Sequence, residues 1–300
     1  MTIDGVRVAV LDVGSNSVRL LVADVAGERV TPVRSEREYV RLGADAYEFG
    51  HIGSKKLERT RTVARSFSRI ARDAGAERVE TIVTAPGRQI ANADELVQAL
   101  VASTGTAVIS LTAEEEGCLA WEGAIAGLEE PPEVVGVVDL GGGSCEVAVG
   151  TPSLGPVWVE SFDAGGLRVT QEHLSGDPPS AETIERARAR IAELLATSTR
   201  PPRPDVMLAV GGVSRAVARI AGRPIGGDRL EALIAALWSS SKADVVRRHG
   251  VSPERAATLL GGTLVLAQVA RLVGQDLVPT RGGVREGAAL ALAGAQAAAA

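Results

Sequence analysis

The segments VLDVGSNSVRLLV (10–22) and VVDLGGGSCEVAV (137–149) determine the fold, because the second repeats the pattern of the first. Their alignment superposes three pairs of polar or glycine positions: Asp12 on Asp139, Gly14 on Gly141 and Ser17 on Ser144. Each segment contains an apolar run typical of a buried strand, an acid at its end, a glycine turn with Ser, and a returning strand. Two such hairpins predict two similarly folded domains, each with a turn of the size that binds phosphate.

Strand-like and helix-like segments alternate around both hairpins, which predicts the α/β class. In the first half we expect a strand near 30–40, a helix over 54–74 with Ser54 as its N-cap, and a helix over 112–127 that begins with a capping box. The stretch Glu129–Pro132 breaks the pattern, which then begins again. The expected domains are 1–125 and 126–300, with the closing helix 284–298 packing back on the first domain.

Composition narrows the function classes. The chain has 300 residues, 45% of them hydrophobic, and a formal net charge of −5. This charge gives no overall attraction to nucleic acid, so we expect no such partner. The two cysteines cannot form a disulfide framework, and the three histidines lack ligand spacing for zinc. No apolar run has the length of a membrane span, and no signal-peptide pattern is present, so we expect a cytoplasmic protein without a membrane partner.

The acids at the two strand ends are candidates for metal binding. Asp12 and Asp139 lie where carboxylate oxygens would bind Mg²⁺, and Glu146 follows its turn closely enough to join them. Each Asp could instead cap its own turn, a common use of this residue. Glycine and Ser in the turns leave backbone N–H groups free to converge on an anion.

Three further motifs have both a structural and a catalytic interpretation. Ala113–Gly117 (AEEEG) offers three carboxylates in a first helical turn, where acids also stabilise the helix dipole. TAPGRQIAN (84–92) places Arg88 on a loop just before a helix, either as a bidentate phosphate clamp or as a solvated side chain. AVGGVSR (209–215) is a third glycine turn at a strand end. Cys118 and Cys145 are expected to be small buried residues rather than nucleophiles.

Five motifs in order resemble the exopolyphosphatase and guanosine pentaphosphate phosphohydrolase (Ppx/GppA) family, and they span nearly the whole chain. They are DVGSNSVRL (12–20), TAPGRQIAN (84–92), TAEEEGCLA (112–120), VDLGGGSCEV (138–147) and VREG (284–287). The resemblance implies two ribonuclease-H-like domains of the actin, sugar-kinase and Hsp70 superfamily, with a cleft between them. The duplicated hairpin had already indicated two homologous halves.

The resemblance also implies a role for individual residues. Glu116 takes the place of the general base, and Asp139 and Glu146 take places that bind Mg²⁺, with Mn²⁺ as a substitute. The phosphate-holding places fall on eight residues: Gly14, Ser15, Asn16, Arg19, Arg88, Gly142, Gly143 and Ser144. The implied reaction is attack of water on a terminal phosphoanhydride, with orthophosphate as product.

The chain departs from the family pattern at several positions. Gly117 and Cys118 replace the usual Ala and Arg after the base, which removes one positive charge near it. Ala85–Gly87 replaces Ser-Ala-Leu before Arg88, and Cys145 replaces a Thr. The chain also lacks the extra helical domains of longer relatives, so we expect it to prefer short polyphosphates.

Several functions compete on these motifs. The leading one is a Mg²⁺-dependent exopolyphosphatase, and the same site would also suit guanosine pentaphosphate as substrate. A weakly active polyphosphate or nucleotide sensor is a third interpretation, although a pure binder has no need of Glu116. A kinase of the same superfamily is the fourth, and the sequence shows no acceptor site for it. A homodimer is compatible with the sequence.

Overall fold

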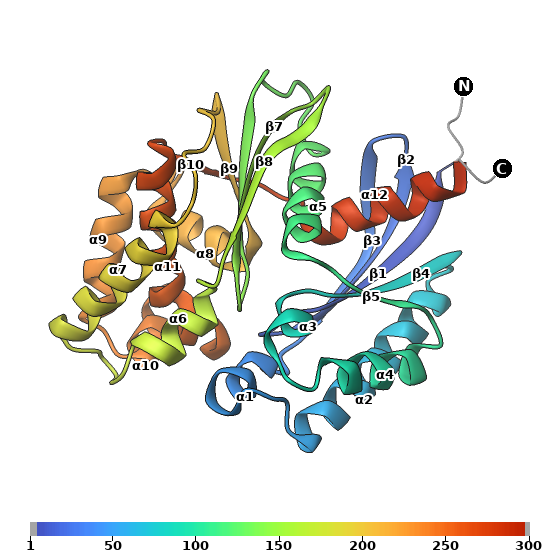
Figure 1. The fold of residues 1–300 in the computed structure, drawn as a ribbon, viewed down its shortest axis with the longest axis horizontal. Coiled ribbons are helices and arrows are strands. Elements are labelled where there is room, and N and C mark those ends of the chain that lie inside the picture. The colour runs from blue at the N-terminus through green and yellow to red at the C-terminus, as the bar shows by residue number, and fades with distance from the viewer. Residues whose placement is uncertain (1–4, 298–300) are drawn as a thin grey trace. The chain divides into compact units, whose positions relative to one another are not determined.

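A computed structural model describes residues 5–297 and divides the chain into two compact units (Figure 1). Unit 1 comprises the chain up to Glu130 together with the residues from Gly282 onward. Unit 2 comprises Pro131–Arg281. The last helix of the chain therefore belongs to the same unit as the first strand.

Unit 1 is built on a mixed five-stranded sheet with the order β3-β2-β1-β4-β5. β1 and β2 form the first hairpin, β3 extends it antiparallel, and β4 and β5 are parallel to β1. The strands are β1 (Val6–Val13), β2 (Val18–Ala26), β3 (Arg29–Glu38), β4 (Arg78–Val83) and β5 (Val108–Ser110).

Helices cover both faces of this sheet, because both faces of β1 are apolar. Ala9 and Leu11 pack under α2 and α4, whereas Val8 and Val10 pack under α5 and α12. Alternate residues of a strand point to opposite faces, so the near-continuous apolar run of β1 requires cover on both. The helices are α1 (Leu42–Phe49), α2 (Ser54–Asp73), α3 (Ala85–Gln89), α4 (Ala93–Thr104), α5 (Ala113–Ile125) and α12 (Val284–Ala297).

Unit 2 repeats this topology. Its sheet order is β10-β9-β6-β7-β8, in which β6, β7 and β8 are antiparallel neighbours and β9 and β10 are parallel to β6. The order is that of unit 1 read from the other edge, so the predicted α/β fold with two like halves is confirmed. The strands are β6 (Val135–Leu140), β7 (Cys145–Thr151), β8 (Gly155–Phe162), β9 (Val206–Val210) and β10 (Leu277–Pro279).

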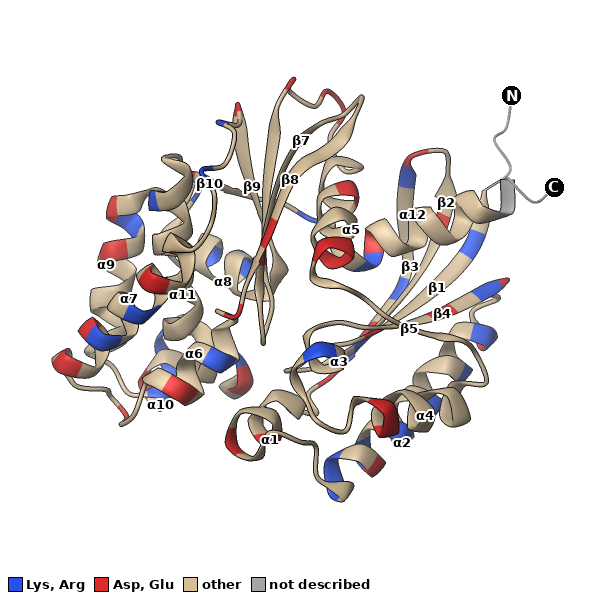
Figure 2. Cartoon of the chain, in the orientation of Figure 1, with Lys and Arg blue, Asp and Glu red and all other residues tan. Residues whose placement is uncertain are grey.

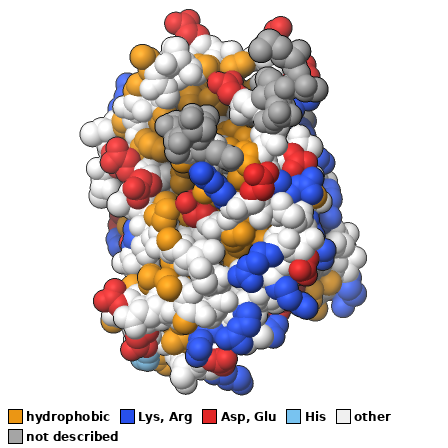
Figure 3. Space-filling view, turned by 90° about the vertical axis from the view of Figure 1, so that its right-hand side faces the viewer, with side chains coloured by type: hydrophobic (Ala, Val, Ile, Leu, Met, Phe, Trp, Pro, Cys, Tyr) orange, Lys and Arg blue, Asp and Glu red, His pale blue; other side chains and the backbone are white. Residues whose placement is uncertain are grey.

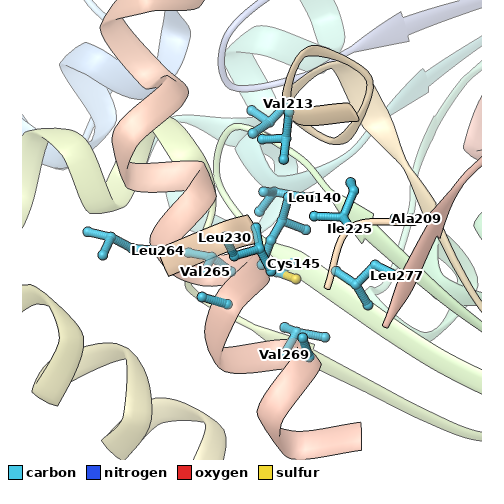
Figure 4. Close-up of a cluster of buried hydrophobic side chains, with 14 of the residues drawn as sticks. Leu140, Cys145, Ala209, Val213, Ile225, Leu230, Leu264, Val265, Val269 and Leu277 are labelled. Atoms are coloured by element: carbon cyan, nitrogen blue, oxygen red, sulfur yellow. The ribbon is translucent and has the colours of Figure 1, made fainter. Parts of the chain in front are cut away.

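The core of unit 2 forms around α11, a helix that is apolar on all sides and mostly buried. Leu264, Val265 and Val269 of this helix belong to one buried cluster with Leu140 of β6 and Leu277 of β10 (Figure 4). α11 is long and apolar enough to cross a membrane, and its burial identifies it as a core helix. The helices are α6 (Gly166–His173), α7 (Ala181–Ala196), α8 (Gly211–Ala221), α9 (Gly227–Trp238), α10 (Lys242–His249) and α11 (Pro253–Val273).

Some local predictions were right and others wrong. The capping box at Thr112 is confirmed, because Thr112 Oγ1 accepts from Glu115 N and Glu115 Oε2 accepts from Thr112 N. Ser54 is not an N-cap: it is the first helical residue of α2, and Gly53 precedes it with no side-chain cap. α1 and α3 were not predicted, and α8 begins at Gly211, inside the stretch 209–215 that was predicted as a glycine turn.

Glycines let α12 cross α5 closely. A Cβ at Gly123 would overlap the carbonyl oxygen of Gly283, and one at Gly287 would overlap the carbonyl oxygen of Leu119. Only glycine allows such an approach of two backbones. The glycine of the VREG motif is therefore explained by this packing, which fixes the start of α12 against the helix that contains Glu116.

Candidate active site

The turn of the unit 1 hairpin is held by backbone hydrogen bonds. Gly14 N donates to Ser17 O at 3.1 Å, which closes the turn between β1 and β2. The start of α1 then packs onto it: Gly43 N donates to Ser15 O at 2.7 Å, and Arg41 N donates to Asn16 O at 3.0 Å. These bonds occupy carbonyl oxygens and leave the side chains of the turn for other partners.

Two side chains of this turn suit an anion. The Ser15 side chain is buried, and its Oγ has no hydrogen-bond partner within residues 5–297. A buried hydroxyl without a partner is costly unless a ligand or water satisfies it. Arg19 Nε donates to Ser17 Oγ at 3.2 Å, which places a positive charge beside the turn.

The turn of the unit 2 hairpin has the same construction. Gly141 N donates to Ser144 O at 3.1 Å, the counterpart of the bond that closes the first turn. The start of α6 packs onto it as α1 does in unit 1, with Leu167 N donating to Gly142 O at 3.0 Å. The duplicated hairpin read from the sequence is thus a duplicated structure.

The residue across from the strand-end Asp differs in charge between the two hairpins. In unit 1 the cross-strand partner of Asp12 is Arg19, whereas in unit 2 the partner of Asp139 is Glu146. Arg19 and Glu146 occupy equivalent places in the repeat. The first hairpin therefore places a guanidinium across from the carboxylate, and the second places another carboxylate there.

The two carboxylates of unit 2 fit a small divalent cation. Glu146 is buried and Ser161 Oγ donates to its Oε1 at 2.8 Å, while the negative charges of Glu146 and Asp139 help raise the pKa of Cys145 well above its usual value, after burial itself. Mg²⁺ typically takes one or two carboxylates and completes its shell with water and phosphate oxygens. A pair suffices for that, and no cluster of three or more ligating side chains is found in the described part of the chain.

Asp12 has different surroundings. Burial raises its pKa, and three nearby arginines oppose the rise: Arg19, Arg285 and Arg37. Arg37 follows from the register of β3, and Arg285 comes from α12 and donates to Leu20 O at 3.5 Å. Burial in turn lowers the pKa of Arg285. Within unit 1 Asp12 thus lies among cations, and its predicted role as a metal ligand stays a prediction.

The predicted base and the predicted phosphate clamp contact each other. Arg88 donates through Nη2 to Glu116 Oε2 at 2.8 Å and through Nη1 to Leu111 O at 2.8 Å. The Glu116 side chain is only 7% exposed. A buried carboxylate needs a partner of opposite charge, and Arg88 supplies it. Arg88 lies inside the short helix α3, not on a loop before a helix as expected.

The three carboxylates of the α5 start separate into different roles. Glu114 is exposed, and Glu115 accepts from the backbone of Thr112, which lowers its pKa. The helix-end interpretation therefore accounts for Glu115. It does not account for Glu116, which is buried on the other side of the turn and held by Arg88. Cys118 stands where the resemblance implies an Arg near the base. Arg88 supplies a positive charge beside Glu116.

The third glycine turn lies beside the metal-fitting pair. Gly211 has φ +95° at the start of α8, and a Cβ there would lie 3.2 Å from Asp139 Oδ1. The guanidinium of Arg255 lies so close to Gly212 that a side chain at 212 would overlap it. Sequence reasoning noticed this turn and missed Arg255, which no local motif marks.

These features agree with comparisons to known proteins. A model of the Ppx/GppA phosphatase family matches residues 21–295. The chain belongs to this family. It is 29% identical to exopolyphosphatase 2 of Mycobacterium tuberculosis, over 96% of this chain and 99% of that protein. It is also 29% identical to exopolyphosphatase 1 of the same species, over 86% and 80%.

Solved structures show the same fold at lower sequence identity. A Ppx/GppA family member of Aquifex aeolicus superposes with a TM-score of 0.81 at 24% identity, over 97% of this chain and 99% of that one. An exopolyphosphatase from Cytophaga hutchinsonii gives 0.85 at 20% identity, over 96% and 98%. This chain thus shares the fold of solved Ppx/GppA proteins over nearly its whole length.

Proposed function

We propose that this Ppx/GppA protein is an exopolyphosphatase, which releases terminal orthophosphate from inorganic polyphosphate. The observation that carries the proposal is the buried Glu116, paired with Arg88 at 2.8 Å on the first turn of α5. Its similarity to two mycobacterial exopolyphosphatases over most of its length supports the choice of substrate. The reaction is hydrolysis of a phosphoanhydride.

Glu116 would accept the proton of the attacking water. A buried carboxylate whose orientation is fixed by Arg88 and by the rigid start of α5 is suited to orient one water molecule for in-line attack. Arg88 has a second task in this proposal, because its guanidinium would also attract the phosphoryl group that is transferred. The proton moves from water to a Glu116 oxygen, and the phosphate chain leaves with the bridging oxygen.

The two turns would hold the phosphates. In unit 1 the candidates are the Gly14–Asn16 backbone, Ser15 Oγ and the Arg19 guanidinium. In unit 2 they are the backbone of Gly142 and Gly143 with Ser144. Asp139 and Glu146 would hold Mg²⁺, or Mn²⁺ in its place, and Asp12 remains a candidate ligand. When bound, the metal ion neutralises negative charge on the phosphate oxygens.

A second substrate, guanosine pentaphosphate, is favoured by one observation. The Gly211–Gly212 turn starts α8 beside Asp139, and Arg255 lies over Gly212. A helix start with a cation above it would suit the additional phosphates of a nucleotide. In this alternative the base and the reaction stay the same.

The experiment is phosphate release with Mg²⁺ from four substrates side by side: short polyphosphate, long polyphosphate, guanosine pentaphosphate and ATP. Glu116→Gln should lower turnover by roughly a thousandfold, because it removes the base. Glu114→Gln is the matched control, since Glu114 lies in the same turn and is exposed, and it should retain full turnover. Selective release from guanosine pentaphosphate would select the alternative. Binding without release from any substrate would contradict an enzyme and favour a sensor.

Two further expectations belong to this proposal. We expect a cytoplasmic location, which the composition predicts. A homodimer stays a prediction, to be tested by light scattering.

A further inference from the structure

The most basic element of this acidic protein is α2, which the proposed reaction does not use. Seven of its residues are Lys or Arg and two are acidic. Because the helix contributes +5 and the whole chain has −5, the rest of the chain contributes −10. Figure 2 shows the blue segments along α2, and Figure 3 shows a face of the molecule on which Lys and Arg side chains gather.

Five exposed basic side chains define what we call the α2 basic face: Lys55, Arg59, Arg65, Arg69 and Arg72. At about 100° per residue they fall within an arc of about 140°. The opposite side of the helix is buried and apolar, with Val63 and Phe67 in the core. Packing therefore forces the cations outward together.

Several of these cations have no acidic partner. Arg59 pairs with Glu38, and Arg72 donates to Thr104 O at 2.7 Å. Lys55, Arg65 and Arg69 make no ion pair or hydrogen bond within residues 5–297. The two acids of the helix, Glu58 and Asp73, are exposed and lie within the same arc. Glu58 pairs with Arg61 at 3.1 Å, so Asp73 is the acid of this helix that offsets part of the charge of the five cations.

The α2 basic face begins next to the phosphate turn of unit 1. Arg41 N donates to Asn16 O at 3.0 Å, and Lys56 Nζ donates to Arg41 O at 2.7 Å. Two hydrogen bonds thus connect the turn to the first residues of α2, and the exposed Arg41 lies between them. From Lys56 to Arg72 the helix extends for about 24 Å.

We propose that the α2 basic face binds the distal part of a polyphosphate chain whose end lies at the turn of residues 14–17. The inference rests on the proposed function, since it extends the same substrate. A linear polymer of phosphates matches a row of exposed cations with a net positive charge that starts near a phosphate site. The α2 basic face affects how tightly long chains bind, whereas the expected preference for short chains concerns turnover per chain end.

The composition of the face favours this ligand over nucleic acid and membranes. Proteins that bind single-stranded nucleic acid stack bases on aromatic side chains, and the one aromatic residue of α2, Phe67, is buried. Helices that bind membrane surfaces insert apolar side chains, and the apolar residues of α2 face the core or are half-buried. A ligand with phosphates and no bases or acyl chains remains.

The test compares long-chain polyphosphate with tripolyphosphate, which is too short to leave the turn. The variant Lys55→Gln/Arg65→Gln/Arg69→Gln should weaken binding of long chains roughly tenfold at about 0.05 M salt. The slope of log affinity against log salt should fall in magnitude by about 2, the value for three lost phosphate contacts. The ratio of kcat/KM for long chains to that for tripolyphosphate should fall by the same factor of about ten.

Two further variants separate charge from folding. Arg186→Gln/Arg190→Gln/Arg247→Gln removes the same charge from exposed positions of unit 2 and should change binding less than about twofold. Arg65→Lys/Arg69→Lys keeps the charge and should bind long chains as the parent does. An unchanged melting temperature of each variant shows that it is folded.

The outcomes distinguish this inference from the proposed function when binding is measured in the Glu116→Gln background. Binding of long chains that depends on Lys55, Arg65 and Arg69 supports the inference even if no substrate is hydrolysed. Hydrolysis with equal binding by parent and triple variant overturns the inference alone. Tighter binding of single-stranded RNA or of phosphatidylserine vesicles through the same three residues would also overturn it.

Discussion

The two hairpins of this protein have the same backbone turn, and they differ in the charge of the residue across from the strand-end Asp. Both turns close with a glycine N–H donating to a Ser carbonyl at 3.1 Å, and both are covered by the start of a helix. The residue across from the strand-end Asp is Arg19 in unit 1 and Glu146 in unit 2. This cross-strand position thus adds a positive charge beside the first turn and a second carboxylate, which fits a cation, beside the second.

This difference shows how one fold can place either a positive charge or a second carboxylate beside a glycine turn that attracts phosphate. Backbone N–H groups in a glycine turn attract anions wherever the turn occurs. Side chains on the returning strand then decide whether the neighbourhood adds a positive charge or a second carboxylate. In the described part of the chain the arginines Arg37 and Arg285 reinforce the first choice, and Ser161 supports the second.

The strongest test of the comparison is Glu146→Gln. It keeps the shape of the side chain and removes the second carboxylate of unit 2, so the Mg²⁺ concentration for half-maximal phosphate release should rise, and turnover at fixed Mg²⁺ should fall by about 100-fold. A parallel measurement is the rise in melting temperature with added Mg²⁺, which should shrink. Arg19→Gln should leave both Mg²⁺ responses as they are. Equal responses from the two variants would contradict the division between hairpins.

An intermediate effect is expected from Gly287→Ala, which changes the packing of α12 within unit 1. The added methyl would overlap the carbonyl oxygen of Leu119, so α12 must shift with Arg285, and the free energy of unfolding should fall by about 2 kcal/mol. Gly294→Ala is the control on the same helix, because a Cβ there meets open space and should stabilise by about 0.5 kcal/mol. Urea unfolding measures both. Equal stabilities would show that the α5–α12 contact is less tight than described.

The smallest effect concerns pH and Arg19→Gln. Burial raises the pKa of Asp12 in the folded state, so the charged form of Asp12 destabilises the fold at neutral pH. This cost is relieved as the pH falls toward the pKa of Asp in the unfolded chain, which is about 4. Arg19 reduces the cost, so its loss should lower the free energy of unfolding at pH 7 by about 1 kcal/mol. The deficit should shrink as the pH is lowered.

Unfolding in urea at pH 7 and pH 5 measures this difference. Arg34→Gln is the control, because Arg34 is exposed on β3 and forms an ion pair with Glu36 on the same strand. A deficit of the same size at both pH values would show that Asp12 does not sense Arg19.

Sequence patterns predicted what is local. The alternation of apolar residues, the glycine turns and the Thr112–Glu115 capping box each depend on residues a few positions apart, and the structure contains all of them. The extents of separately folding domains, set at residue 125, stay a prediction. α1 was missed because its eight residues include Gly43 and follow Arg41, which lies in the left-handed region and makes no side-chain cap.

The rest depends on distant residues. Arg88 and Glu116 are 28 residues apart and meet because α3 and α5 both start at the ends of parallel strands. Arg285 reaches Leu20 across 265 residues. Hydrophobic periodicity does not indicate such contacts. The VREG motif likewise does not indicate which elements α12 packs against. Arg255 and Arg37 were missed for the same reason.

The return of the last helix to the first unit has a consequence for biosynthesis. Val8, Val10 and Ile82 form an apolar face that is covered partly by Ala288 and Ala289 of α12. The ribosome makes β1 first and α12 only after all of unit 2, so the part of this face that α12 covers stays uncovered while some 150 residues are added at about 5–20 residues per second. Unit 2 is contiguous and has no such delay. The nascent chain therefore completes its second half before its first, and a chaperone that binds it would be expected at the uncovered side of β1.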